Sequence, residues 1–242
     1  MKKLILKLLP DRIINCISKI RKSQFFDYVQ SYSQEGEDMI LKEIFRNNNK
    51  GFYIDVGSHH PKRFSNTNYF YKNGWHGIYI DAMPGSMKIF NKMRKRDLNL
   101  EIAISDTKEI LTYYEFKESA VNTFSKALAD ERINLPQFGY LNSYEISTEK
   151  LSDIFDKYLL ENMAIDFMSV DVEGFDLKAL ASNDWNKYRP TVILVEDIGF
   201  SVEHCSESEI YVFLKQKGYK IIAKTMNTLI FTEETYNYNI YE

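Results

Sequence analysis

Four acidic residues lie where two apolar runs of the sequence end. Asp171 and Glu173 follow the run IDFMSV, and Glu196 and Asp197 follow the run TVILV. An unpaired charge is costly in a protein interior, so carboxylates in such places need a partner or a task. They can accept a proton from a substrate hydroxyl or hold a hard divalent cation through their oxygen atoms. They can also pair locally with backbone amides or a basic residue.

Two chemical interpretations of these carboxylates follow. As a general base, Asp171 or Glu173 would accept the proton of a hydroxyl nucleophile. As metal ligands, Asp171, Glu196 and Asp197 would bind a divalent ion such as Mg²⁺ or Mn²⁺, which would polarise that hydroxyl. The metal interpretation requires the two apolar runs to be neighbouring strands of one sheet.

A third apolar run ends in the sequence IDVGSHHP. Gly57 after a strand allows a tight turn and the close approach of a ligand, and Asp55 can accept hydrogen bonds there; alternatively, Gly57 only ends the strand. A dinucleotide site needs further glycines in this turn, which here holds His59, His60 and Pro61. The sequence therefore disfavours a dinucleotide and is compatible with a cofactor without phosphates. His59 and His60 are the next candidates for a base.

A fourth apolar run, HGIYIDA, places Asp81 at its end. A carboxylate at the end of the second strand can accept hydrogen bonds from both hydroxyls of a ribose. Alternatively, Asp81 caps a helix that begins at Pro84. Together with Asp55, it predicts a nucleoside site.

These residues must be positioned by strands that alternate with helices. We predict strands over 51–57, 76–82, 98–105, 111–116, 165–172, 191–197, 219–224 and 228–233, and helices over about 65–73, from Pro84, over about 151–160, over about 175–182 and from Ser206 to Gly218. Alternation predicts a parallel sheet covered by helices on both faces, and the last two strands form an antiparallel hairpin. This is the layout of the class I S-adenosylmethionine (SAM) methyltransferase fold, a Rossmann-like α/β fold with seven strands.

The domain organisation follows from the same pattern. We predict one domain over residues 31–242, interrupted by an insertion over about 106–150 that adds the strand 111–116 and otherwise mixes short helix and loop. Residues 1–30 form a basic helical extension, with seven Lys or Arg against one Asp in residues 1–22. That segment either packs on the domain or on a second subunit, or touches an anionic membrane surface or a partner enzyme.

Composition excludes several classes of protein. The net charge of −3 argues against a nucleic-acid binder with a wholly basic surface. Cys16 and Cys205 lack metal or redox spacing and indicate a reducing compartment such as the cytoplasm. No run reaches the roughly 18 apolar residues of a membrane span.

Several motifs together resemble the FkbM-type SAM-dependent methyltransferases. The resemblance covers roughly residues 31–200, in the segments YSQEGEDMIL, FYIDVGSHHPKRFSNTNYFYKNGWHGIYIDAMP, IAISD, NTFSK and IDFMSVDVEGFDLKAL. It implies methyl transfer from SAM to an oxygen, commonly a sugar hydroxyl, and bacterial members often act in the biosynthesis of surface polysaccharide. From the cysteine usage we expect a cytoplasmic enzyme, with a peripheral contact to the inner membrane through residues 1–22 as the alternative.

The resemblance also implies roles for residues at the strand ends. The methionine end of SAM would contact Asp55, Gly57 and Ser58, the ribose Asp81, the adenine Ala82 and Met83, and the adenine edge Ser105 and Asp106. This chain departs from many relatives at His59-His60-Pro61, where they have Asn and a second Gly, and at Phe175, where they have His.

The acceptor is expected over the same edge of the sheet. Candidate contacts are Gln34 and Asp38, the stretch 59–67 with Arg63, Asn66 and Thr67, and aromatic residues of the insertion. Arg63 and Lys62 either grip a phosphate of a nucleotide sugar or form solvated charges. Three alternatives stay open: a non-catalytic scaffold in polysaccharide assembly, an O-methyltransferase of another small molecule, and a nucleotide-dependent oxidoreductase.

Overall fold

A computed structural model describes residues 29–161 and 163–236 of the chain. The chain divides into two units, residues 1–31 and 32–242, and the architecture below is that of the second. The predicted basic extension over residues 1–30 falls almost entirely outside the described residues.

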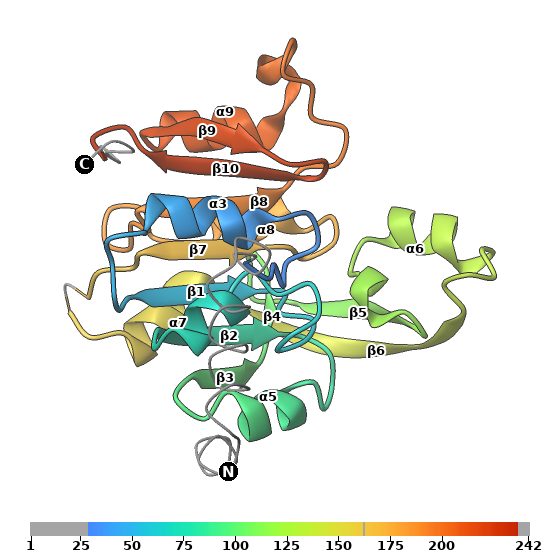
Figure 1. The fold of residues 1–242 in the computed structure, drawn as a ribbon. Helices are drawn as coiled ribbons and strands as arrows, with labels where there is room; N and C mark the ends of the chain where they lie inside the picture. Colours follow the sequence, from blue (N-terminus) through green and yellow to red (C-terminus); the bar gives the residue numbers. More distant parts are fainter. Residues whose placement is uncertain (1–28, 162, 237–242) are drawn as a thin grey trace, which may run out of the picture. The chain divides into compact units, whose positions relative to one another are not determined.

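A seven-stranded sheet forms the centre of this unit (Figure 1). In their order across the sheet, the strands are β3 (Leu98–Glu101), β2 (His76–Asp81), β1 (Phe52–Val56), β7 (Phe167–Val170), β8 (Val192–Glu196), β10 (Thr228–Glu233) and β9 (Tyr219–Lys224). The first five run parallel, and β10 is antiparallel to both of its neighbours. The predicted parallel sheet with a C-terminal antiparallel hairpin is confirmed.

Helices cover both faces of the sheet. On one face lie α3 (Glu37–Ile44), α4 (Asn68–Lys72) and α5 (Met87–Met93), and on the other lie α7 (Leu151–Tyr158), α8 (Asp176–Ala181) and α9 (Glu209–Gln216). All five residues of β1 are buried. Tyr53 belongs to the core on the side of α3, α4 and α5, and Ile54 belongs to the core on the side of α7, α8 and α9. Strands buried on both faces are nearly continuous apolar runs, which explains why the sequence pattern revealed them. No helix in the described ranges is long and apolar enough to cross a membrane.

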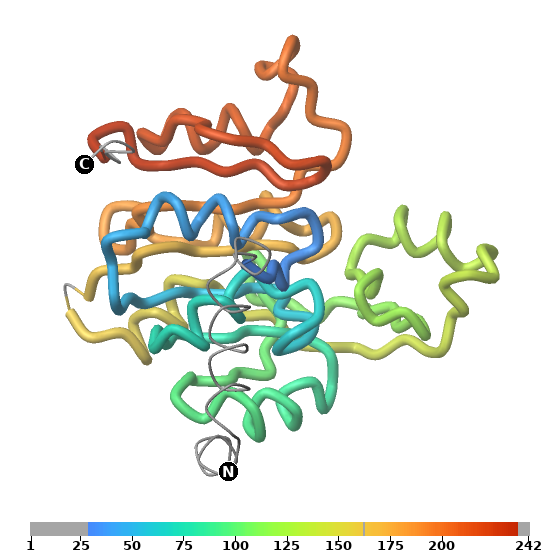
Figure 2. The backbone as a smooth tube through the Cα atoms, viewed as in Figure 1, coloured from blue at the N-terminus to red at the C-terminus, as the bar shows by residue number. Residues whose placement is uncertain are grey.

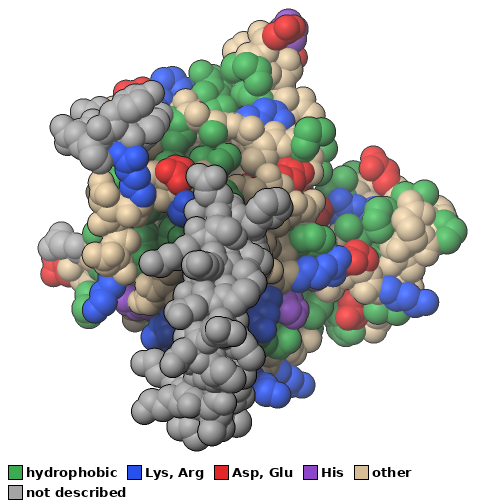
Figure 3. Space-filling view, viewed as in Figure 1, with side chains coloured by type: hydrophobic (Ala, Val, Ile, Leu, Met, Phe, Trp, Pro, Cys, Tyr) green, Lys and Arg blue, Asp and Glu red, His purple; other side chains and the backbone are tan. Residues whose placement is uncertain are grey.

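A second, three-stranded sheet occupies the segment that breaks the alternation. It consists of β4 (Ala103–Ile104), β6 (Tyr140–Glu149) and β5 (Ile110–Phe116) in that order, with the 3-10 helix η3 (Ser119–Val121) and α6 (Lys126–Ile133) between β5 and β6. Figures 1 and 2 show β5, β6 and α6 extending past the carboxyl ends of β1 and β2. Hydrophobic and charged side chains lie side by side on this part of the surface (Figure 3).

Several predicted boundaries were wrong. The strand 98–105 is two strands, because the chain leaves the large sheet after Glu101 and β4 pairs with β6 instead. The ten-residue β6 was missed, since most of its side chains are exposed and give no apolar alternation. Helix α5 begins at Met87 rather than Pro84. Helix α9 is capped by Ser208, whose side chain accepts a hydrogen bond from the amide of Tyr211.

The aromatic cluster beneath α3 and α4 generates a stability prediction. Phe167 is fully buried, and its ring centroid lies 5.0–6.1 Å from those of Phe45, Tyr53, Phe70 and Trp75. Phe167→Ala should lower the free energy of unfolding by about 3–5 kcal/mol through lost contacts and a cavity, measured by denaturant unfolding.

The control for this prediction is Leu160→Ala, at a side chain that is 77% exposed. It should change the free energy of unfolding by less than about 0.5 kcal/mol. Equal effects of the two substitutions would contradict the assignment of Phe167 to the core.

Candidate functional site

A cavity of about 280 Å³ opens at the carboxyl ends of the parallel strands. Ligands in open α/β sheets bind at this edge. The cavity is lined by the residues that follow β1, β2, β7 and β8 and by residues 118–124 of the segment between β5 and α6. The two sheets of the unit therefore share one cavity.

Gly57 allows β1 and β7 to end close together. It has φ 85°, and a Cβ atom added to it would lie 1.6 Å from the carbonyl oxygen of Asp171. The amide of Asp171 donates to the carbonyl of Val56 at 2.9 Å. A side chain at position 57 would thus clash with the backbone of Asp171 and strain its own backbone. The glycine serves the approach of β7, a reason that the sequence did not disclose.

Asp55 lies on the cavity floor and is nearly buried. Thr67 Oγ1 donates to its Oδ2 at 3.1 Å and also contacts the Tyr79 hydroxyl at 2.7 Å. Burial raises the pKa of Asp55 to about 6, although the hydrogen bond from Thr67 opposes the shift. Thr67 itself is fully buried behind Asp55 and does not line the cavity, so its predicted acceptor contact is wrong.

Asp81 lies at the end of β2 and also lines the cavity. Its Oδ1 accepts a hydrogen bond from the amide of Met83 at 2.7 Å. Desolvation raises the pKa of Asp81 to about 7, with the Met83 amide opposing the shift. Ala82 lines the cavity beside it, whereas Met83 does not; the Met83 sulfur instead accepts from the Asn122 amide.

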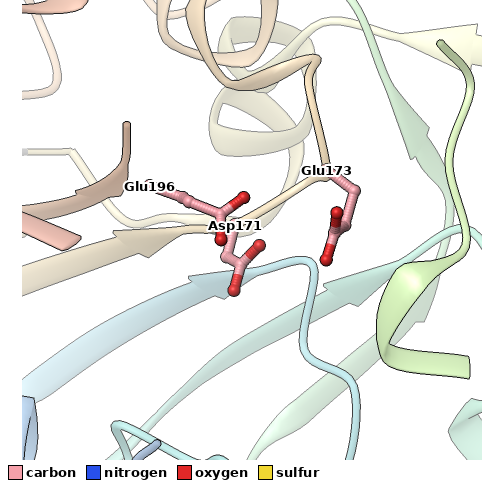
Figure 4. Close-up of side chains that lie close together, drawn as sticks. All are labelled: Asp171, Glu173 and Glu196. Carbon is pink, nitrogen blue, oxygen red and sulfur yellow. The ribbon is translucent and has the colours of Figure 1, made fainter. Parts of the chain in front are cut away.

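Three carboxylates meet where β7 and β8 end. Asp171, Glu173 and Glu196 each place a carboxylate oxygen within 4.8 Å of the others, and Figure 4 shows the three side chains gathered where β7 and β8 end. Among the described residues, no hydrogen-bond donor reaches the carboxylate oxygens of Asp171 or Glu196. Asp197 lies outside this group, because successive strand residues point to opposite sides and its carboxylate accepts from Ser208 Oγ at 2.5 Å. Its predicted role as a metal ligand is corrected.

The proximity of these groups alters their acidity. Desolvation by the cavity walls and the Glu196 carboxylate raise the pKa of Asp171, although its side chain opens onto the cavity. Desolvation and the Glu173 carboxylate raise the pKa of Glu196. Desolvation also raises the pKa of Glu173, and Arg132 opposes that shift. Like charges this close favour a shared proton or a bound cation.

The histidines and Arg63 form one side of the cavity mouth. Arg63 donates to both carboxylate oxygens of Glu118, at 3.0 and 2.9 Å, and lies 3.3 Å from the His59 ring nitrogen. His60 Nδ1 accepts from the amides of Lys62 and Arg63. Burial, followed by the charge of Arg63, lowers the pKa of both histidines. Arg63 therefore already has an anionic partner in this structure, in an ion pair whose side chains are 48% and 35% exposed.

The remaining predicted residues divide between cavity and interior. Ser58, Gln34 and Asn66 line the cavity, and Asn66 Nδ2 donates to Ser169 Oγ at 3.0 Å. Asp38 is fully buried and accepts from the Tyr32 amide and Ser33 hydroxyl at the start of α3, so it does not face an acceptor.

The adenine-edge pair is also displaced from the cavity. Ser105 is fully buried and donates to Asp106, and neither residue lines the cavity. Both follow β4, which belongs to the small sheet rather than to the strand edge assumed from the sequence.

One wall of the cavity comes from the insertion, beside which the sequence placed the acceptor. Of the insertion aromatics, Tyr113 and Phe124 line the cavity. The other residues of the segment 118–124 were not singled out, since they follow β5 of the small sheet rather than a strand of the large one. Asn122 Oδ1 accepts from the backbone amide of Phe116 and fixes this wall. Arg132, which pairs with Glu173, was missed.

Solved structures similar to this chain include three methyltransferases. An FkbM methyltransferase from Methylobacillus flagellatus is 10% identical with a TM-score of 0.45, over 76% of this chain and 44% of its own. A precorrin-6y C5,15-methyltransferase from Geobacter metallireducens is 10% identical (TM-score 0.42, 86% and 93% covered). A Bacillus cereus O-methyltransferase in complex with SAH is 9% identical (TM-score 0.38, 93% and 91% covered).

The chain thus spans less than half the length of the first of these structures. A comparison with curated proteins gave no match. The family model of the methyltransferase FkbM domain matches residues 55–221, which is more than half of the chain. These residues include the ends of β1, β2, β7 and β8 that form the cavity. The chain belongs to the FkbM methyltransferase domain family.

Proposed function

We propose that this chain transfers a methyl group from SAM to a hydroxyl oxygen of an uncharged sugar unit. The observation that carries the proposal is that one cavity, in a chain of a methyltransferase family, is lined by two different groups of residues. Asp55, Gly57 and Asp81 line it where β1 and β2 end, and the carboxylates of Asp171 and Glu196, which no described donor reaches, line it where the neighbouring strands β7 and β8 end. The first group suits a nucleoside, and the second suits a hydroxyl that must lose a proton.

The SAM end of the cavity is supported by the residues after β1 and β2. The carboxylate of Asp81 would accept hydrogen bonds from the ribose hydroxyls, with Ala82 beside the adenine. Asp55 and the backbone at Gly57 and Ser58 would hold the methionine end. Carboxylates also stabilise a ligand that carries a sulfonium cation.

The chemistry at the other end requires alignment and a base. SAM supplies an electrophilic methyl group when bound. The protein must hold the acceptor oxygen in line with that methyl carbon, so that the O–C bond forms as the C–S bond breaks. Asp171 accepts the hydroxyl proton in this proposal, and Glu196 beside it favours protonation of the pair. The products are then the methylated acceptor, the thioether S-adenosylhomocysteine and the protonated carboxyl of Asp171, so that every atom and the proton are accounted for.

The charge of the cavity supports an uncharged acceptor. Its described lining includes six carboxyl groups and, of Lys and Arg, only Arg63, which is paired with Glu118. An anionic acceptor would therefore meet repulsion without a free cation to offset it. The side-chain amides of Gln34, Asn66 and Asn122 line the cavity and suit sugar hydroxyls. On the family resemblance, we assign the reaction to surface-polysaccharide assembly in the bacterial cytoplasm.

A divalent metal ion is a second candidate at the acceptor end. Three carboxylate oxygens within 4.8 Å suit the oxygen preference of Mg²⁺ or Mn²⁺, and such an ion would polarise the acceptor hydroxyl. Asp171 and Glu196 would hold it, because one oxygen of Glu173 already accepts from Arg132.

SAM binding should depend on the ionisation of Asp81. Its carboxyl is charged above a pKa of about 7 and protonated below it, and protonation removes acceptors for the ribose. The Kd of SAM should therefore rise about tenfold between pH 8 and pH 6. Asp81→Asn should raise the Kd about 10- to 100-fold at pH 8 and remove most of this pH dependence. Calorimetric titration measures both.

Glu101→Gln is the matched control, at an exposed carboxylate that ends the neighbouring strand β3. Its Kd should stay within about twofold of the wild type. An Asp81→Asn variant that binds SAM as the wild type does would contradict the ribose assignment.

Turnover should depend on Asp171. With methyl-labelled SAM, label should reach neutral glycans and not uronic acids or sugar phosphates, whereas Asp171→Asn should lower kcat about 10²- to 10⁴-fold because the base is lost. The SAM Kd should change little. Asp153→Asn, at an exposed carboxylate of α7, is the control.

Each other result of this assay has a meaning. SAM binding without label transfer to any acceptor would favour the scaffold alternative. Wild-type turnover by Asp171→Asn would remove Asp171 as the base. Turnover lost with a chelator and restored by Mg²⁺ or Mn²⁺ would establish the metal, and turnover unaffected by a chelator would exclude it.

A further inference from the structure

Arg132, in the last turn of α6, joins two walls of the cavity. Its Nη2 donates to Glu173 Oε2 at 2.6 Å, and its Nη1 donates to the carbonyl of Val121 at 2.8 Å. The Arg132 and Glu173 side chains are only 12% and 16% exposed. An ion pair so little exposed is weakly screened by salt, and truncating one partner leaves an uncompensated charge. Arg132 therefore ties a carboxylate of the cluster to the small-sheet segment.

The backbone around Glu173 is held from the same side. Glu173 has φ 50° and Gly174 has φ 90°, and the left-handed region is unfavourable for a residue with a long side chain. Thr123 Oγ1 donates to the carbonyl of Glu173 at 2.6 Å. The carboxylate of Asp176 accepts from the amide of Gly174 at 3.0 Å. The turn is thus fixed in a strained conformation that aims Glu173 at the cluster.

Arg132 divides the roles of the three carboxylates. Three negative charges within a few ångströms repel one another strongly in a partly dry cavity. The guanidinium of Arg132 forms its ion pair with Glu173, and its second hydrogen bond goes to a backbone carbonyl. At longer range its charge also opposes the rise in the pKa of Glu196, without a hydrogen bond to that carboxylate. Asp171 and Glu196 keep carboxylate oxygens that no described donor reaches.

We propose that Arg132 is a positioning residue for methyl transfer: it fixes Glu173 as its ion-pair partner and leaves Asp171, beside Glu196, to take the proton. The inference rests on the proposed function. Arg132 does not line the cavity, so it acts through Glu173 and the wall at Val121 rather than on the acceptor.

The test compares variants of Arg132 by kcat, acceptor KM and SAM Kd. Arg132→Gln should lower kcat about 100-fold. Without its ion-pair partner, the Glu173 carboxylate would shift within the cluster and disturb the alignment of Asp171 with the acceptor hydroxyl. Arg132→Lys should recover part of this loss, since it restores the charge without the second hydrogen bond. The SAM Kd should stay within about threefold, because the hydrogen bonds of Arg132 go to Val121 and Glu173 and not to Asp55 or Asp81.

A double variant distinguishes a role of Arg132 in positioning the reacting groups from a role in folding alone. Arg132→Gln combined with Glu173→Gln should have a higher kcat than Arg132→Gln alone, because no unpaired carboxylate remains. Lys126→Gln is the matched control, since Lys126 lies on the same helix in an exposed pair with Asp130. It should leave kcat unchanged. If the fold-loss of kcat in the double variant equals the product of the fold-losses in the two single variants, the inference is overturned.

Denaturant unfolding of the same variants completes the test. If the effects of the substitutions at positions 132 and 173 are non-additive both in the free energy of unfolding and in log kcat, the inference is supported. If they are non-additive in the free energy of unfolding alone, the pair is only a structural contact and the inference is overturned. A wild-type chain that methylates no acceptor would instead overturn the proposed function, a result distinct from an active wild type whose Arg132→Gln variant keeps its kcat.

Discussion

The close approach of β1 and β7 at Gly57 is the constraint on which the site depends. Any side chain there would overlap the carbonyl of Asp171, so only glycine lets the two strands end side by side. This contact brings Asp55 and Asp171 to one edge of the sheet, with Asp81 and Glu196 on the flanking strands. The cavity that could join a nucleoside to an acceptor hydroxyl exists because two backbones meet without a Cβ between them.

The second organising feature is an excess of negative charge that the protein offsets only in part. Arg63 pairs with Glu118 at the mouth, and Arg132 pairs with Glu173 from outside the lining. Arg63 lines the cavity itself, and Arg132 binds Val121 and Glu173, which both line it, so charge balance and cavity shape are coupled. No described hydrogen-bond donor reaches the carboxylates of Asp171 and Glu196. Their uncompensated negative charge suits a site that receives a proton from a neutral hydroxyl or holds a cation.

The sequence predicted the large sheet well and the small sheet poorly, for a physical reason. Strands buried on both faces form apolar runs, and a charged residue at the end of such a run stands out, as Asp55, Asp81 and Asp171 do. By contrast, β6 is largely exposed and polar. The Arg132–Glu173 pair joins residues 41 positions apart, which no local pattern records.

The errors among the site residues have similar causes. Asp197 follows Glu196 directly, and strand alternation turns it toward Ser208. Ser105 and Asp106 were assigned to the large sheet, but the chain had already passed to the small one. Thr67 lies behind Asp55 rather than beside an acceptor. For Asp197 and Thr67 the direction of the side chain decided the role, and for Ser105 and Asp106 the change of sheet did.

The central claim is that one cavity holds SAM at the β1 and β2 ends and the acceptor at the β7 and β8 ends. A crystal structure of the full chain with S-adenosylhomocysteine tests it most directly. We predict the ribose hydroxyls within hydrogen-bond distance of Asp81 and the sulfur turned toward Asp171 and Glu196. A ligand bound elsewhere, or one whose sulfur faces away from these carboxylates, would contradict the claim.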